Sequence, residues 1–263
     1  MSQALHAEWT KLRTLGATGW LLLAVVALTA GVGAALAAAT RCSPGACAAA
    51  ATGLDPAKVS LTGVQAGQAL VAIIGVLAIS NEYSTGMIRV TLTAMPRRWS
   101  VLGAKALLVG GLVLAAGGVA VLGSVLAGRV LLPARGLSAA NGYRLPSLAY
   151  GPDLRAAVGS VLYLVLVALL ALGIATAVRD SAVAIGLVLG LLYLFPIVSS
   201  VVGNQHWQRH LEQVSPMTAG LYVQVTVGLT RLPLAPWQGL GVLAAWACCA
   251  LLLGALALHL RDA

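Results

Sequence analysis

Long apolar stretches separated by short polar gaps form the main pattern of this sequence. A stretch of about twenty residues, folded as a helix, covers about 30 Å, which is the thickness of a bilayer's hydrocarbon core. Six stretches reach that length and are predicted to span the membrane, at residues 20–39, 61–80, 105–127, 154–178, 181–202 and 237–258. The pattern therefore predicts an all-α polytopic membrane protein, with residues 1–263 forming a single transmembrane domain.

The pattern before the first span predicts a helix that lies flat in the membrane interface, within residues 1–19. Trp9 recurs at helical spacing with other apolar residues, while Lys11 and Arg13 fall elsewhere on the helical wheel. A solvated tail is the alternative. A cleavable signal peptide is not expected, because the apolar run that follows is too long for one.

The stretch from residue 214 to residue 232 is only moderately apolar, because serine, proline, glutamine and threonine interrupt it. It could form a seventh span, but we expect short helices in the outer leaflet. The two residues Arg179 and Asp180 form the shortest connection between spans, so the fourth and fifth spans should make a tight hairpin. Glycines four residues apart, Gly63 with Gly67 and Gly186 with Gly190, are weak signals of close helix packing.

Composition agrees with a membrane location. Apolar residues make up 60% of the chain and charged residues 9%, whereas soluble domains average about 25% charged residues. The formal net charge is +9, but the basic residues are spread over the gaps and form no stripe for nucleic acid. Basic residues divide equally between the two sides, but the local cluster of Arg97 and Arg98, flanked by Arg89 and Lys105, favours a cytoplasmic N-terminus. That orientation also places the loop with Cys42 and Cys47 on the oxidising side.

Four cysteines fall in two settings. Cys42 and Cys47 flank a Ser-Pro-Gly-Ala turn after the first span, where they could close a small disulfide loop on an oxidising face or remain free thiols. Cys248 and Cys249 lie inside an apolar run and are expected to act as small apolar residues.

No catalytic motif is present in the sequence. It contains neither a phosphate-binding loop nor a His-Glu-x-x-His or Gly-x-Ser-x-Gly string, so no catalytic residue and no metal site is assigned. His206 and His210 share one face of any helix there, but a pair without a third ligand favours solvated histidines. No charged residue falls near the middle of a predicted span, which argues against a proton relay.

The gap between the second and third spans differs from an ordinary loop. It runs Asn-Glu-Tyr-Ser-Thr-Gly-Met-Ile-Arg-Val-Thr-Leu over residues 81–92. Met87 and Val90 recur at helical spacing, with Glu82 and Arg89 near them, which predicts a short amphipathic helix at the membrane surface. A generic interfacial loop is the alternative.

This segment resembles the first cytosolic loop of ABC-2 type permeases, the membrane subunits of ATP-binding-cassette exporters. That family commonly shows a Glu-Tyr/Phe-x-x-Gly-Thr/Met-Ile/Leu-Arg string, then a Pro-Arg pair and a lysine that opens the next span. The matching residues here are Glu82, Tyr83, Gly86, Met87, Ile88, Arg89, Pro96, Arg97 and Lys105. The N-terminal string Glu8-Trp9-Thr10-Lys11-Leu12-Arg13-Thr14 is similar to the opening of many actinobacterial members. With the six-span layout, the resemblance covers nearly the whole chain; Met87 departs from the threonine often found there.

The resemblance implies that the segment is a coupling helix, which docks on a separate cytosolic ATPase through Glu82, Tyr83, Thr85, Gly86, Met87 and Arg89. It implies a bacterial plasma-membrane protein with both termini cytoplasmic, working with a second copy or a homologous permease. ATP and Mg would bind the ATPase, leaving this chain without a cofactor or an enzymatic activity. By the same analogy, Gln65, Gln68, Ser199 and Ser200 could line the pathway, although helix packing explains these polar residues equally well.

Three other functions can be compared with the sequence. A secondary carrier without an ATPase should show inverted repeats and buried ionisable groups, and the sequence indicates neither. An intramembrane enzyme would need a nucleophile–base or metal constellation. A permease-like immunity or scaffold protein is compatible with the sequence and remains the alternative.

Overall fold

The computed structural model describes residues 16–40, 53–87 and 98–260, and within them it is entirely helical. It contains six helical stretches that are long and apolar enough to cross a membrane. These are α2 (Gly16–Ala39), α4 with α5 (Pro56–Leu61 and Val64–Ser84), α7 (Arg98–Leu131), α8 (Gly151–Val178), α9 (Ser181–Val201) and α12 (Pro236–Leu260). The predicted fold class and number of spans are confirmed: the chain is a multi-pass helical membrane protein.

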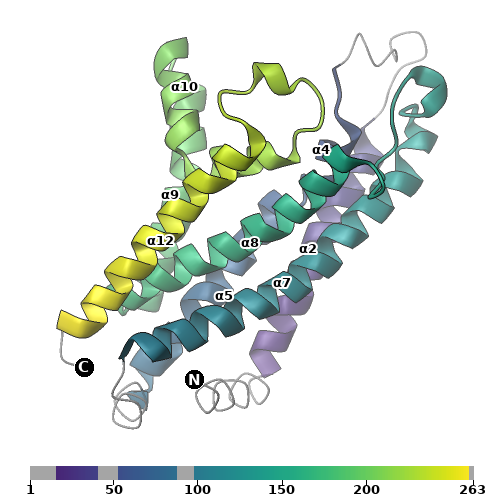
Figure 1. Cartoon of the computed structure of the whole chain (residues 1–263). Helices are drawn as coiled ribbons and strands as arrows, with labels where there is room; N and C mark the ends of the chain where they lie inside the picture. The colour runs from purple at the N-terminus through teal and green to yellow at the C-terminus, as the bar shows by residue number, and fades with distance from the viewer. Residues whose placement is uncertain (1–15, 41–52, 88–97, 261–263) are drawn as a thin grey trace.

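The spans run side by side in alternating directions (Figure 1). The end of the bundle where α2 begins and α12 finishes is here called the N-side, and the other end is called the far side. The ends of α5 and α8 and the starts of α7 and α9 therefore also lie on the N-side. The short helix α4 and the connection between α7 and α8 lie on the far side, at the upper right of Figure 1.

The fourth span, α8, lies at the centre of the molecule. It packs against α5, α7, α9 and α12, and more than half of its apolar window is buried. Less than a fifth of the apolar window of α9 is buried, so most of the surface of α9 is not covered by the rest of this chain. Exposed apolar side chains such as Leu187, Leu194 and Ile197 cover that surface.

Glycines allow two of the closest helix contacts. A Cβ atom on Gly63 would lie 1.9 Å from the Thr29 carbonyl oxygen, and one on Gly67 would lie 2.0 Å from the Thr29 hydroxyl. These two glycines therefore let α5 approach α2 closely, as small residues do in membranes. The other predicted pair, Gly186 with Gly190 on α9, faces open space within this chain.

The helices extend beyond the predicted spans, most of all in α7. This helix begins at Arg98 and has 34 residues, which gives a length of about 51 Å at 1.5 Å per residue. Lys105, expected at the start of the third span, instead lies about two turns inside α7 and is only 3% exposed. A charged residue can lie there because its charge is paired, as described below.

Short helices fill the connection between the last two spans. They are α10 (Gln205–Val214), α11 (Pro216–Leu221) and the 3₁₀ turns η3 (Tyr222–Gln224) and η4 (Leu229–Arg231). None is long enough to cross a bilayer, so residues 214–232 do not form a seventh span. Two further turns, η1 (Pro133–Arg135) and η2 (Ala139–Asn141), lie between α7 and α8.

Exposed tryptophans mark both ends of the apolar bundle. Trp20 near the start of α2 and Trp99 near the start of α7 lie on the N-side, and their side chains are 75% and 51% exposed. Trp237 at the start of α12 lies on the far side and is 53% exposed. Tryptophan is enriched at membrane–water interfaces, so these positions fit a bilayer around the bundle.

Candidate functional site

The N-side end of α5 is terminated by local hydrogen bonds and a glycine. The Thr85 hydroxyl donates to the Asn81 carbonyl oxygen at 2.7 Å, and the Gly86 amide donates to the Tyr83 carbonyl oxygen at 3.2 Å. Gly86 has a φ of 70°, the left-handed conformation that commonly ends helices. Glu82 and Tyr83 thus belong to the last turn of α5, ahead of this stop. Arg89 and the remainder of the predicted coupling helix lie outside the described residues.

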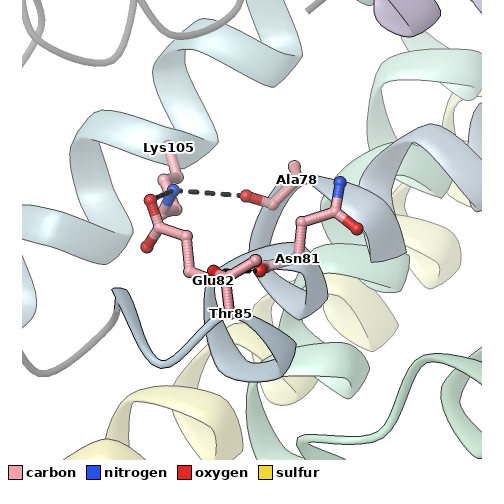
Figure 2. Close-up of polar contacts among 5 residues, drawn as sticks. All are labelled: Ala78, Asn81, Glu82, Thr85 and Lys105. Atoms are coloured by element: carbon pink, nitrogen blue, oxygen red, sulfur yellow. Dashed lines mark hydrogen bonds and ion pairs between the residues drawn. The ribbon is translucent and has the colours of Figure 1, made fainter.

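Glu82 forms a buried ion pair with Lys105. The Lys105 Nζ atom lies 2.9 Å from Glu82 Oε1, and both side chains are less than a tenth exposed. The same ammonium group donates to the Ala78 carbonyl oxygen at 3.2 Å, as Figure 2 shows. Charged residues within membrane segments usually pair in the bundle interior. This pair joins the last turn of α5 to α7, so the Glu82 carboxylate points into the protein and not toward a docking partner.

Tyr83 joins the same turn of α5 to α8. Its hydroxyl donates to the Thr176 carbonyl oxygen at 3.4 Å. The guanidinium of Arg179, the residue that caps α8, lies over the Tyr83 ring with 5.5 Å from Cζ to the ring centroid. Stacking of this kind on an aromatic face is attractive for a cation. Adjacent residues of α5 therefore make contacts with two different spans.

The surface of this end is formed by the residues after the helix stop. Thr85, Gly86 and Met87 are all exposed, and the Met87 side chain is 44% exposed. A Cβ atom on Gly86 would meet nothing within 4 Å. The structure thus divides the predicted coupling residues into two groups: Glu82 and Tyr83 anchor the end of α5, while Thr85, Gly86 and Met87 are presented to the surroundings.

The predicted pathway residue Gln68 lies in the core of the single chain. Its side chain is fully buried; the Tyr163 hydroxyl donates to its Oε1 atom, and its Nε2 atom donates to the Met217 sulfur at 3.3 Å. The Gln224 side chain extends this polar cluster by donating to the Ser160 hydroxyl at 3.0 Å. Gln68 therefore holds α11 against α5 and α8, which is a packing role.

The other predicted pathway residues bond locally or to a neighbouring helix. Gln65 is half-buried, and its backbone carbonyl accepts a hydrogen bond from the Tyr193 hydroxyl at 3.1 Å. The Ser199 hydroxyl donates to the Pro196 carbonyl oxygen at 2.9 Å, and Ser200 is exposed on the same turn of α9. The structure does not bring these serines together with the two glutamines through any described hydrogen bond.

Several predicted residues fall outside the described parts of the chain. They are the interfacial residues Trp9, Lys11 and Arg13 and the possible disulfide partners Cys42 and Cys47. Cys248 and Cys249 are free and exposed on α12, within the apolar span. The rings of His206 and His210 meet on α10 with centroids 4.5 Å apart, but the described residues supply no third ligand beside them.

The far side contains a polar clasp that sequence inspection missed. The buried Asp55 carboxylate accepts hydrogen bonds from the Thr226 amide at 2.6 Å, the Thr226 hydroxyl at 2.7 Å and the Val227 amide at 3.2 Å. Arg155 donates to the Val225 carbonyl oxygen at 2.6 Å. Nearby, burial and the Glu212 carboxylate raise the pKa of Tyr222. The clasp holds the segment after α11 on the bundle. Its partners are far apart in the sequence, so the sequence pattern could not reveal it.

The two ends of the bundle thus differ in kind. On the far side the polar groups close on one another, whereas on the N-side the anchored end of α5 leads to exposed residues. No protein-family model matches the sequence, and no curated protein matches it either. What the fold and these contacts define is a class: a multi-pass helical membrane protein with six candidate spans in its described part.

Proposed function

We propose that this chain is the permease subunit of an ATP-driven exporter, coupled to a separate cytosolic ATPase through the segment after α5. The carrying observation is the string from Glu82 to Arg89, followed by Pro96, Arg97 and Lys105, which resembles the coupling loop of ABC-2 type permeases. In this proposal the N-side is cytoplasmic. ATP and Mg bind the ATPase, and two permease chains enclose the pathway by alternating access.

The contacts at the end of α5 support this proposal. A coupling element must be exposed where it docks and firmly joined to the spans that it moves. Thr85, Gly86 and Met87 are exposed, and the residues just before them are joined to α7 by an ion pair and to α8 by Tyr83. A displacement at Gly86 would therefore reach α5 itself, α7 through the buried ion pair and α8 through the half-buried Tyr83.

The structure also changes the role proposed for Glu82. Because its carboxylate is buried against Lys105, a charge reversal there would place two like charges side by side inside the bundle, at a cost of about 3–5 kcal/mol. Loss of ATPase binding in such a variant would therefore show that the fold is damaged, and it would not show that Glu82 contacts the ATPase. We therefore assign docking to the exposed residues and anchoring to Glu82.

A pair of glycines provides a matched test. Gly86 on the N-side and Gly228 on the far side both have a φ of 70°, and a Cβ atom on either would meet nothing within 4 Å. Replacing either by Trp imposes the same backbone strain on opposite faces. The chain is expressed with the ATP-binding-cassette ATPase encoded beside its gene, and the complex is purified through a tag on the permease.

The proposal predicts that the wild-type chain and the Gly228→Trp variant retain the ATPase, while Gly86→Trp loses most of it at an equal permease yield. Failure of the wild-type chain to retain any ATPase would overturn the proposal. Retention by Gly86→Trp equal to that by Gly228→Trp would overturn the assignment of the docking surface.

A further inference from the structure

Arg179 has a backbone conformation that is unusual for its residue type. It caps the C-terminus of α8 with a φ of 66° and is the only non-glycine residue with positive φ among the described residues. Glycine is the common residue at such a position, because a Cβ atom is disfavoured there. An arginine at this position implies that its side chain makes contacts which a glycine would lose.

The Arg179 guanidinium connects two spans other than its own. On one side it lies over the ring of Tyr83, in the last turn of α5. On the other side its Nη2 atom donates to the Ala257 carbonyl oxygen of α12 at 3.2 Å. Ala257 is among the last four residues of α12, whose carbonyls have no partner within the helix. A cation at a helix C-terminus is also favoured by the helix dipole.

The position of α8 makes this connection direct. α8 packs extensively against both α5 and α12 and lies between them in the bundle. Its N-side end is fixed by the short turn into α9, where the Asp180 carboxylate accepts a hydrogen bond from the Val183 amide at 2.8 Å. If the guanidinium follows a displacement of Tyr83, its hydrogen bond to Ala257 also pulls on the end of α12.

We propose that Arg179 is a positioning residue that relays displacement of the α5 end to α12. This inference rests on the proposed function, since the displacement is the one that an ATPase docked at Gly86 would produce. The Glu82–Lys105 pair transmits the same displacement to α7, and Arg179 adds α12 through its hydrogen bond to the Ala257 carbonyl. The outcome is a coordinated movement of spans on both sides of α8.

The test measures movement of α12 directly. The four cysteines are replaced by Ser, and His259→Cys places a single thiol at an exposed position in the last turn of α12. The permease–ATPase complex is prepared in inside-out vesicles. The labelling rate with a membrane-impermeant maleimide is then compared without nucleotide and with ATP plus vanadate.

Two variants and one control separate the relay from a structural role. Arg179→Lys keeps the charge but loses the planar group that stacks and donates together. Arg179→Gly removes the side chain and relieves the left-handed backbone, which offsets part of the stability lost with its contacts. Arg155→Lys, at the other end of α8, loses a comparable guanidinium-to-carbonyl bond, to Val225.

The relay predicts that nucleotide changes the labelling rate several-fold in the parent chain and in Arg155→Lys. In both Arg179 variants, the nucleotide-dependent change in labelling rate should be less than half of the change in the parent chain. The amount of bound ATPase should be unaltered. A full change in the Arg179 variants overturns the relay alone, as does an unchanged labelling rate in a parent complex that hydrolyses ATP. Absence of any complex with the parent chain overturns the proposed function and the relay with it.

Discussion

At the scale of single residues, charge pairing explains how polar side chains occupy an apolar bundle. Lys105 is acceptable inside α7 because Glu82 and the Ala78 carbonyl surround its ammonium group. The Asp55 carboxylate is satisfied in the same way by the Thr226 and Val227 amides. Each of these charges is paired with groups that are distant in sequence. Removing the partner at either site would therefore leave a charge buried in the bundle.

The Glu82–Lys105 pair predicts strong non-additivity between two substitutions. Glu82→Leu or Lys105→Leu alone should lower the free energy of unfolding by about 3–5 kcal/mol, because each removes one partner of a buried ion pair and keeps the other charge inside the bundle. The double variant should recover most of that loss, since it buries two apolar side chains instead. Unfolding of the purified protein in mixed micelles measures all four corners of the cycle. Additive losses would show that the two side chains do not interact.

At the scale of helices, the local pattern was enough to predict the elements but not their contacts. The six spans follow from runs of apolar residues, a property of each segment alone. The extra turns at the start of α7 were hidden because Arg98, Ser100 and Lys105 interrupt the apolar pattern, and only the fold supplies Glu82 as a partner for Lys105. The contact of Arg179 with Tyr83 could not be predicted either, because it depends on which spans are neighbours.

The candidate site shows the same division. The string after α5 was recognisable because its residues are consecutive, so Gly86 and Met87 could be predicted as a surface feature. Sequence alone could not show that Glu82 faces inward. Nor could it show that Gln68 is enclosed with Tyr163, since a polar residue in a span has the same signature whether it packs or lines a pathway.

Helix packing gives a prediction with a control in the neighbouring span. A Cβ atom on Gly173 of α8 would lie 2.5 Å from backbone atoms of Ala250 and Leu251 on α12, whereas one on Gly190 of α9 meets nothing within 4 Å. Gly173→Ala should therefore destabilise the protein by about 1–3 kcal/mol through overpacking. Gly190→Ala should stabilise it or leave it unchanged, because Ala favours a helix by about 0.5–1 kcal/mol. Thermal unfolding in detergent compares the two; a larger loss for Gly190→Ala would contradict this packing.

At the scale of the whole molecule, the two ends of the bundle have opposite characters. The far side is closed by the clasp of Asp55 and Arg155 on the segment after α11. The N-side gathers the ends of α5, α8 and α12 around Tyr83 and Arg179, beside exposed residues. The proposed coupling needs this asymmetry: exposed residues on the face where the partner docks, and firm connections from that face to the spans.

The most direct test of the proposed coupling is to identify the protein that contacts the exposed residue Met87 on the N-side. A photo-crosslinking amino acid is placed at Met87 on the N-side and, as the control, at Val214 on the far side; both positions are exposed. Cells that express the chain with the ATPase encoded beside its gene are illuminated. The proposed coupling predicts a permease–ATPase adduct from position 87 and none from position 214. No adduct from position 87, or equal adducts from both positions, would contradict it.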